Sequence, residues 1–185
     1  MKYTKKIFLF TVVFLAMYSC STKKDTIVNR NYHALTTYFN ILFNGEEVFK
    51  DGIEGINKGF KDDWFEQLPI EPIVFDDRKI AAPKFNNIGP GGGFGLKKNN
   101  STTSDESKEQ TPFEKAEEKA VKAIQKHGMN INGLERNRQI DDAYLLLGKS
   151  RYYSQRFIPA IEAFNYVIAN YPNASLIAET KIWRA

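Results

Sequence analysis

The chain has 185 residues, of which 26 are basic and 22 acidic, giving a formal charge of +4, and it contains a single cysteine. Long blocks of Lys and Arg and aromatic-basic alternation are missing from the sequence, which argues against a nucleic-acid-binding protein. One cysteine excludes a disulfide framework within the chain, so core packing must hold the fold, and 42% hydrophobic residues suffice for a small domain.

The first 20 residues have the order of a bacterial export signal. Three lysines among the first six residues precede an apolar run over residues 7–17, which is too short to span a bilayer comfortably. The box Met-Tyr-Ser-Cys then ends at Cys20 and resembles a lipoprotein cleavage site, although its tyrosine departs from the usual small residue. We predict a lipoprotein signal at residues 1–19 and a covalent lipid on Cys20. The alternative is an ordinary secretory signal, or an uncleaved anchor, with an unmodified cysteine. Cleavage before Cys20 would remove those lysines and leave a nearly neutral mature chain.

A polar tether over residues 20–30 is expected to lead into an N-terminal helical hairpin. Asn31 is a plausible N-cap, and Asp51-Gly52 is expected to end the first helix because glycine readily adopts the left-handed conformation of a C-cap. The predicted apolar face of this helix consists of Tyr32, Leu35, Phe39, Leu42 and Phe49. A second, shorter helix is predicted from Ile53, Ile56 and Phe60.

Two segments of low helical propensity follow the predicted hairpin. In "DDWFEQLPIEPIVFDD", large apolar residues stand beside two prolines, so we predict an extended strap over neighbouring helices that completes a unit over residues 31–81. Residues 82–111 combine "GPGGGFG" with a polar stretch and are predicted to be a flexible linker. The glycine run lacks the Gly-Lys-Ser/Thr that would open a helix in a phosphate loop.

Residues 112–185 are predicted to form a tetratricopeptide-like helical region. Pro112 suits the first position of a helix, apolar residues recur at helical spacing after it, and Gly128 ends the run. A 34-residue repeat is then predicted over residues 141–174, and the next repeat begins at about residue 175. The residues that match the repeat pattern are Tyr144, Leu147, Gly148, Ala160, Phe164 and Pro172. Arg151 stands where an aromatic residue is usual, and a generic helical hairpin is the alternative. Because a solenoid requires about three repeats, we expect the chain to be the N-terminal piece of a longer protein.

The first helix of the repeat is the candidate partner-binding element. Its groove-facing residues recur at steps of three and four and are predicted to share one exposed face. These residues are Asp142, Leu145, Lys149 and Tyr152, with Tyr153 at the border. The opposing interpretation is that Leu145 and Tyr152 pack on a neighbouring repeat.

Several stretches resemble the tetratricopeptide lipoproteins of gliding motility and type IX secretion in Bacteroidetes, the SprE/PorW family. The resemblance runs through "NYHALTTYFNILFNGEEVFKDG", "LPIEP", "KAVKAIQKHGMNINGLERNRQIDDAYLLLGKSRYY" and "AIEAFNYVIANYP", and "RQIDDAY" is more specific than the repeat alone. It implies an all-α scaffold anchored in the outer membrane, without enzymatic activity, whose partners are protein components of the secretion machinery.

Enzymatic function is the other class considered. His33 and His127 lie on or beside apolar helix faces, and no motif sets either next to a nucleophile. Adjacent acids, as at 117–118 and 141–142, diverge on a helix and are typical of a solvated face. Ligand spacing typical of a metal site is lacking in the sequence. We therefore expect no enzymatic activity, no metal, no small-molecule substrate and no cofactor other than the covalent lipid.

Two other lipoprotein classes remain as alternatives. A BamD-like barrel-assembly lipoprotein would place tandem repeats soon after the anchor, whereas here a hairpin, a strap and a linker intervene. A SusD-like nutrient-binding lipoprotein would be surface-exposed, and export to the surface is associated with an acidic cluster just after the cysteine. The stretch "CSTKKDT" lacks such a cluster, which favours the periplasmic side of the outer membrane.

Overall fold

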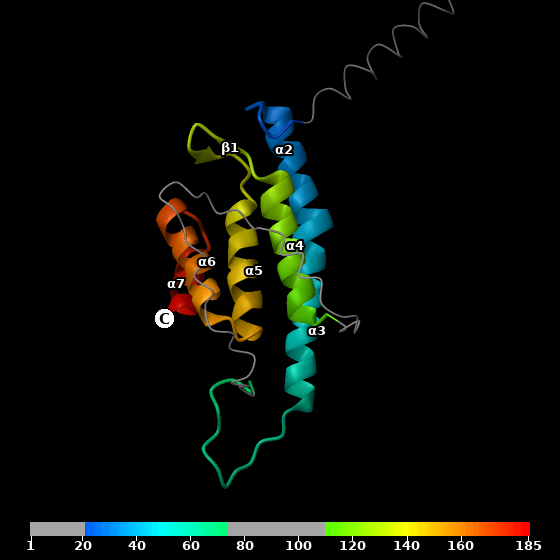
Figure 1. Cartoon of the computed structure of the whole chain (residues 1–185), viewed down its shortest axis with the longest axis vertical. Coiled ribbons are helices and arrows are strands. Elements are labelled where there is room, and N and C mark those ends of the chain that lie inside the picture. The colour runs from blue at the N-terminus through cyan, green and yellow to red at the C-terminus, as the bar shows by residue number, and fades with distance from the viewer. Residues whose placement is uncertain (1–20, 74–109) are drawn as a thin grey trace, which may run out of the picture.

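The computed structural model describes residues 21–73 and 110–185. The predicted signal, Cys20 and all but the last two residues of the predicted linker lie outside these ranges. The described part is all-α apart from one small hairpin of two antiparallel strands, as predicted for the fold class. Its elements are α2 (Ile27–Thr36), η1 (Thr37–Leu42), α3 (Phe43–Gly59), α4 (Pro112–His127), β1 (Asn130–Ile131), β2 (Leu134–Glu135), α5 (Ile140–Tyr153), α6 (Phe157–Asn170) and α7 (Ile177–Arg184). Figure 1 shows α4 and α5 side by side between the long N-terminal helix and the α6–α7 pair.

The N-terminal segment is one continuous helical rod, so the prediction of a hairpin here is wrong. Helices α2, η1 and α3 follow one another without a break from residue 27 to residue 59, and Asp51 and Gly52 lie inside α3 (Figure 1). A Cβ atom on Gly52 would lie 2.9 Å from the ring of Phe113. The glycine therefore admits an aromatic ring from α4 instead of ending the helix, and α4 is the packing partner of the rod.

The buried face of α2 also differs from the prediction, because it is polar. Thr26 caps the helix, its Oγ1 accepting a hydrogen bond of 3.2 Å from the backbone of Asn29, so the helix begins before the predicted cap at Asn31. The side chains that face the interior are Asn29, His33 and Thr37. The residues predicted to be buried, Tyr32, Leu35 and Phe39, are 45%, 58% and 60% exposed. The π-helical turn η1 then shifts the register, and Leu42 and Phe49 are buried as expected.

The proline-containing segment after α3 is non-helical, as predicted, but most of it does not pack on the helices. Trp64, Phe65 and Ile70 are almost fully exposed, so the interpretation as a strap is wrong for this part. Within the described part of the segment, which stops at residue 73, Glu71 lies beside Tyr152 and Tyr153. The rest of the predicted strap, residues 74–81, lies outside the described ranges.

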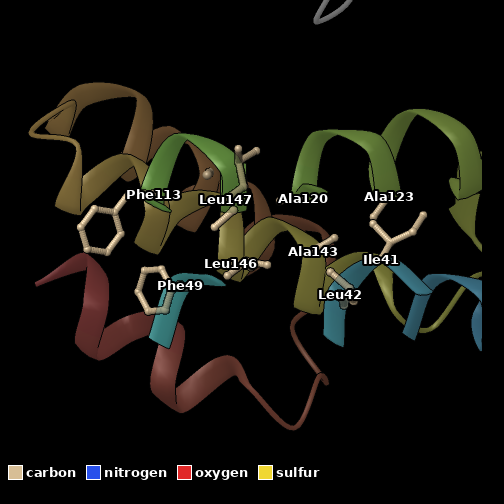
Figure 2. Packing of buried hydrophobic residues seen from close by; sticks show 11 residues of the cluster. Ile41, Leu42, Phe49, Phe113, Ala120, Ala123, Ala143, Leu146 and Leu147 are labelled. Atoms are coloured by element: carbon tan, nitrogen blue, oxygen red, sulfur yellow. The ribbon is translucent and has the colours of Figure 1, made fainter. Parts of the chain in front are cut away.

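Helix α4 is the centre of the first core, shown in Figure 2. Thr111 and Glu114 form a capping box, and Pro112 is the first helical residue, as predicted. The buried side of α4 carries one aromatic residue and three small ones, Phe113, Ala116, Ala120 and Ala123. This narrow alanine stripe lets α4 approach the rod on one side and α5 on the other.

Candidate functional site

The face of α5 predicted to bind a partner is largely covered by α7 in the structure. Leu145 is only 6% exposed and belongs to a second core with Phe164 and Val167, against which Trp183 of α7 packs. The rings of Tyr152 and Trp183 meet edge to face, with centroids 5.7 Å apart. The expectation of one open groove along α5 is therefore wrong for this face, because residues of α6 and Trp183 of α7 pack against its apolar members.

Lys149 lies on the same face and is held by α7. Its ammonium group forms an ion pair with Glu179 and lies 5.3 Å from the centroid of the Trp183 ring. The lysine side chain is 19% exposed, whereas that of Glu179 is 50% exposed. Of this pair, Glu179 is thus the group that remains available to a partner.

Asp142 lies in an acidic environment at the other end of the same face. Burial, followed by the charges of Asp141, Glu46 and Glu179, raises its pKa from 3.8 to about 6, and Lys149 opposes this shift. Burial also raises the pKa of Asp141. The pair at 141–142 is therefore half-buried, and the expectation of a fully solvated acidic face is wrong.

Tyr153, predicted to border the groove, belongs to the first core instead. Its ring stacks on Phe113 with centroids 5.0 Å apart and meets Phe49 edge to face at 5.4 Å. Burial and the nearby Glu71 raise the pKa of the Tyr153 phenol to about 12. Tyr153 thus joins α3, α4 and α5.

Of the six residues that match the repeat spacing, Tyr144, Gly148, Ala160 and Phe164 lie at the contact between α5 and α6, and Leu147 lies in the first core. Gly148 receives the ring of Phe164, since an added Cβ atom would lie 2.3 Å from that ring. Leu147 and Ala160 are buried. Tyr144 stacks on Tyr166 with centroids 4.2 Å apart. Pro172 follows the end of α6 at Asn170.

A buried ion-pair network joins α4 to α5 and was not predicted from the sequence. Nε of Arg151 lies 3.0 Å from Oε1 of Glu117, and the two side chains are only 8% and 15% exposed. Arg156 pairs with the second oxygen of Glu117, while Arg151 also donates a hydrogen bond to the carbonyl of Pro159. The interpretation of Glu117 as part of a solvated pair is therefore wrong. The signal that could have revealed the network was Arg151 itself, at the position where the repeat usually has an aromatic residue.

A second polar network connects α2 to the end of α4. Nδ1 of His33 and Nδ1 of His127 are 3.0 Å apart, and burial lowers the pKa of both imidazoles. The side-chain amide of Asn137 donates to Oγ1 of Thr37 at 3.0 Å and to the carbonyl of His127 at 2.9 Å. The two histidines therefore join α2 to the end of α4 through their mutual contact.

No protein-family model matches the chain, and no curated protein matches it. The described residues hold no group of three or more His, Cys, Asp and Glu side chains arranged for a metal ion. In the part of the chain that the structure describes, every helix falls short of the length and hydropathy that a bilayer span requires.

Proposed function

We propose that the protein is a lipid-anchored, tetratricopeptide-type scaffold of the outer membrane that supports type IX secretion and gliding motility. The observation that carries this proposal is the α5–α6 pair followed by α7. Gly148 of α5 receives the ring of Phe164 of α6, and α7 then packs beside α5 through Trp183. Stacking of this kind, in which each helix covers the apolar side of the previous pair, is the principle of a helical solenoid.

The link to secretion is supported by the resemblance of "RQIDDAY" and the flanking stretches to the SprE/PorW family. The link to the membrane is supported by Cys20, which follows a cationic and then an apolar segment. On this proposal the protein acts by holding components of the secretion machine together at the periplasmic side of the outer membrane, and it performs no catalysis.

The surface proposed to contact a partner is the edge shared by α5 and α7. It contains the partly buried Asp142 and Tyr152, together with the half-exposed Glu179 of α7. Both Asp142 and Glu179 are acidic, so this edge suits a partner segment that carries basic side chains and places an apolar group against Tyr152.

The lipid anchor is tested first, by following the covalent lipid. Wild-type protein should incorporate a radiolabelled or clickable fatty acid and sediment with outer membranes, whereas Cys20→Ala should do neither. A mature N-terminus at another residue, without lipid, would refute the anchor.

The partner surface is tested in the same cells by site-specific crosslinking. A photo-crosslinking amino acid at Asp142 or Glu179 should capture components of the type IX machinery, and the same group at Gln125, exposed on α4, serves as the matched control. Normal secretion in a strain lacking the protein would refute the function. Equal capture from all three positions would refute the surface alone.

A further inference from the structure

We infer that the N-terminal part of the helical rod docks on an anionic membrane surface, through an apolar stripe at the end of the molecule that is rich in basic side chains. The stripe comprises seven large hydrophobic residues of α2, η1 and the first turn of α3. They are 45–76% exposed: Ile27, Val28, Tyr32, Leu35, Tyr38, Phe39 and Phe43. From Asn31 to Gly45 the sequence contains no Asp, Glu, Lys or Arg.

This stripe is unlike the isolated apolar residues found on most protein surfaces. Its members recur at helical spacing on the side of the rod opposite Asn29, His33 and Thr37, which face the interior. The 17 residues from Ile27 to Phe43 extend over about 25 Å of helix. Contiguous exposed apolar surface of this length marks an interaction site.

The stripe ends abruptly where charged residues begin. Glu46 and Glu47 follow Phe43 within about one turn, and from Glu46 to Glu66 the chain carries seven acidic and three basic side chains. Lys50 and Lys58 are already paired, with Glu47 and Glu54. The far half of the rod is therefore unsuited to an anionic surface, which limits the docking surface to the stripe.

The end of the molecule that contains α2 carries an excess of positive charge. Figure 1 shows α2, the β1–β2 hairpin and the end of α4 together at this end. Residues 21–35 and 122–138 contain seven basic and only two acidic side chains. Of the basic residues, Lys23, Lys24, Lys122, Lys126 and Arg138 are exposed. The contact between His127 and His33 places the end of α4, with Lys126, directly beside α2.

The occupant that fits both features is a bilayer containing anionic phospholipid. Apolar and aromatic side chains enter the interface between headgroups and acyl chains, while lysines beside them are attracted to the headgroups. The stripe is also close to the proposed membrane anchor. This argument rests on the proposed lipid at Cys20. Only six residues separate Cys20 from Ile27, so the tether holds α2 within ~25 Å of the membrane.

Docking would fix the orientation of the scaffold. A single lipid at Cys20 leaves the body free to rotate about its attachment, whereas a second contact along the stripe aligns the rod with the membrane.

The test uses the lipidated mature protein in vesicles of phosphatidylethanolamine and phosphatidylglycerol. Because lipid blocks Cys20, the cysteine introduced by Asn40→Cys is the only free thiol and can be labelled with an environment-sensitive fluorophore. Position 40 is next to Phe39, and the substitution removes no residue of the stripe. Glu47→Cys, on the same rod beyond the charge boundary, is the matched control. The label at 40 should shift to the blue and be quenched by lipid-borne quenchers, and the label at 47 should remain in water.

Charge and apolar variants then separate the two contributions. Lys122→Glu with Lys126→Glu should lower the ratio of docked to free body by more than tenfold, since each basic residue near an anionic surface contributes a factor of about five. Lys50→Glu with Lys58→Glu makes the same change in net charge at the far end and should leave docking unaltered. Leu35→Glu with Phe39→Glu should return the label to water while the protein still floats with the vesicles.

Four results would overturn the inference or a part of it. Labels at 40 and 47 that are equally exposed to water on floating vesicles would show that the body does not dock, with the lipid anchor intact. Equal docking on pure phosphatidylcholine would refute the role of charge. Shielding of position 40 in detergent, together with a dimeric mass, would assign the stripe to a second copy of the chain. Failure of the wild-type protein to float would refute the proposed lipid anchor and, with it, the placement of the stripe near the membrane.

Discussion

A Cβ atom on Gly148 would lie 2.3 Å from Cε1 of Phe164, so the backbone of α5 and an aromatic ring of α6 are in direct contact. Gly148 is buried and Phe164 is only 1% exposed. The α5 backbone and the Phe164 ring cannot move apart easily, because Val167 and Leu176 fill the same core.

Gly148→Ala should therefore destabilise the protein even though alanine is the better helix former. Overpacking of a filled core costs about 1–3 kcal/mol, which exceeds the gain in helix propensity of roughly 1 kcal/mol. The free energy of unfolding is measured by urea titration. Gly55→Ala is the control, since nothing lies within 4 Å of a Cβ atom at that position; that substitution should be neutral or stabilising. Equal stability of the Gly148→Ala and wild-type proteins would contradict the close contact.

The ion pair of Glu117 with Arg151 predicts a large loss of stability when the carboxylate is removed. Glu117→Ala would leave the Arg151 side chain, which is 8% exposed, without the carboxylate that forms its ion pair. Removing one partner of a buried ion pair typically costs about 3–5 kcal/mol. Glu118→Ala, at the exposed neighbouring position, should change stability by less than ~0.5 kcal/mol. Chemical denaturation of the two variants compares them directly, and similar midpoints would contradict the buried network.

The histidine pair predicts that stability falls on acidification. The pKa values of His33 and His127 are lowered in the folded state, so below the ordinary histidine pKa of 6.5 the unfolded chain binds more protons than the folded chain. Stability is then lost as the pH falls through that value. Lys122 and Lys126 add to the effect, since their charges also oppose protonation of His127. The chain has only 2 histidines, so NMR titration of their ring protons reports both pKa values. Values at or above 6.5 would contradict this arrangement.

Asp142 predicts a change of the opposite sign in a more acidic range. Its pKa is raised from 3.8 to about 6, so between these values the folded state binds more protons, and stability is lost as the pH rises through this window. Asp142→Asn should therefore stabilise the protein at pH 7, by about 1–2 kcal/mol after allowance for solvent screening, and by much less at pH 4. Thermal unfolding at the two pH values measures the difference. A variant that is less stable than the wild type at pH 7 would contradict the acidic environment.

Much of the second half of the fold could be predicted from the sequence. Pro112 is a local signal for a helix start, because its fixed backbone angle suits the first turn in any context. Gly148 and Ala160 are local signals for close packing at the α5–α6 contact, because they have no large side chain. The all-α class follows in the same way from periodicity over several long segments.

The N-terminal half could not be predicted in this way. The local sequence around Gly52 does not distinguish a glycine that ends a helix from one inside a helix that contacts an aromatic ring. The position of Phe113, 61 residues further along the chain, determines which occurs. Similarly, Leu35 and Phe39 form an apolar face that periodicity assigns to the core. The core side of α2 is instead taken by His33 and Thr37, whose hydrogen-bonding partners, His127 and Asn137, lie about 100 residues away.

The candidate site shows the same division. The spacing of Asp142, Leu145, Lys149 and Tyr152 correctly places them along one face of a helix, because that depends only on the helical repeat. Whether this face is open or covered depends on Trp183 and Glu179 of α7. The sequence by itself thus determined the helices of the second half and the faces they present, through local backbone and side-chain preferences. Only the tertiary structure decided which of those faces are buried, because burial depends on partners distant in the chain.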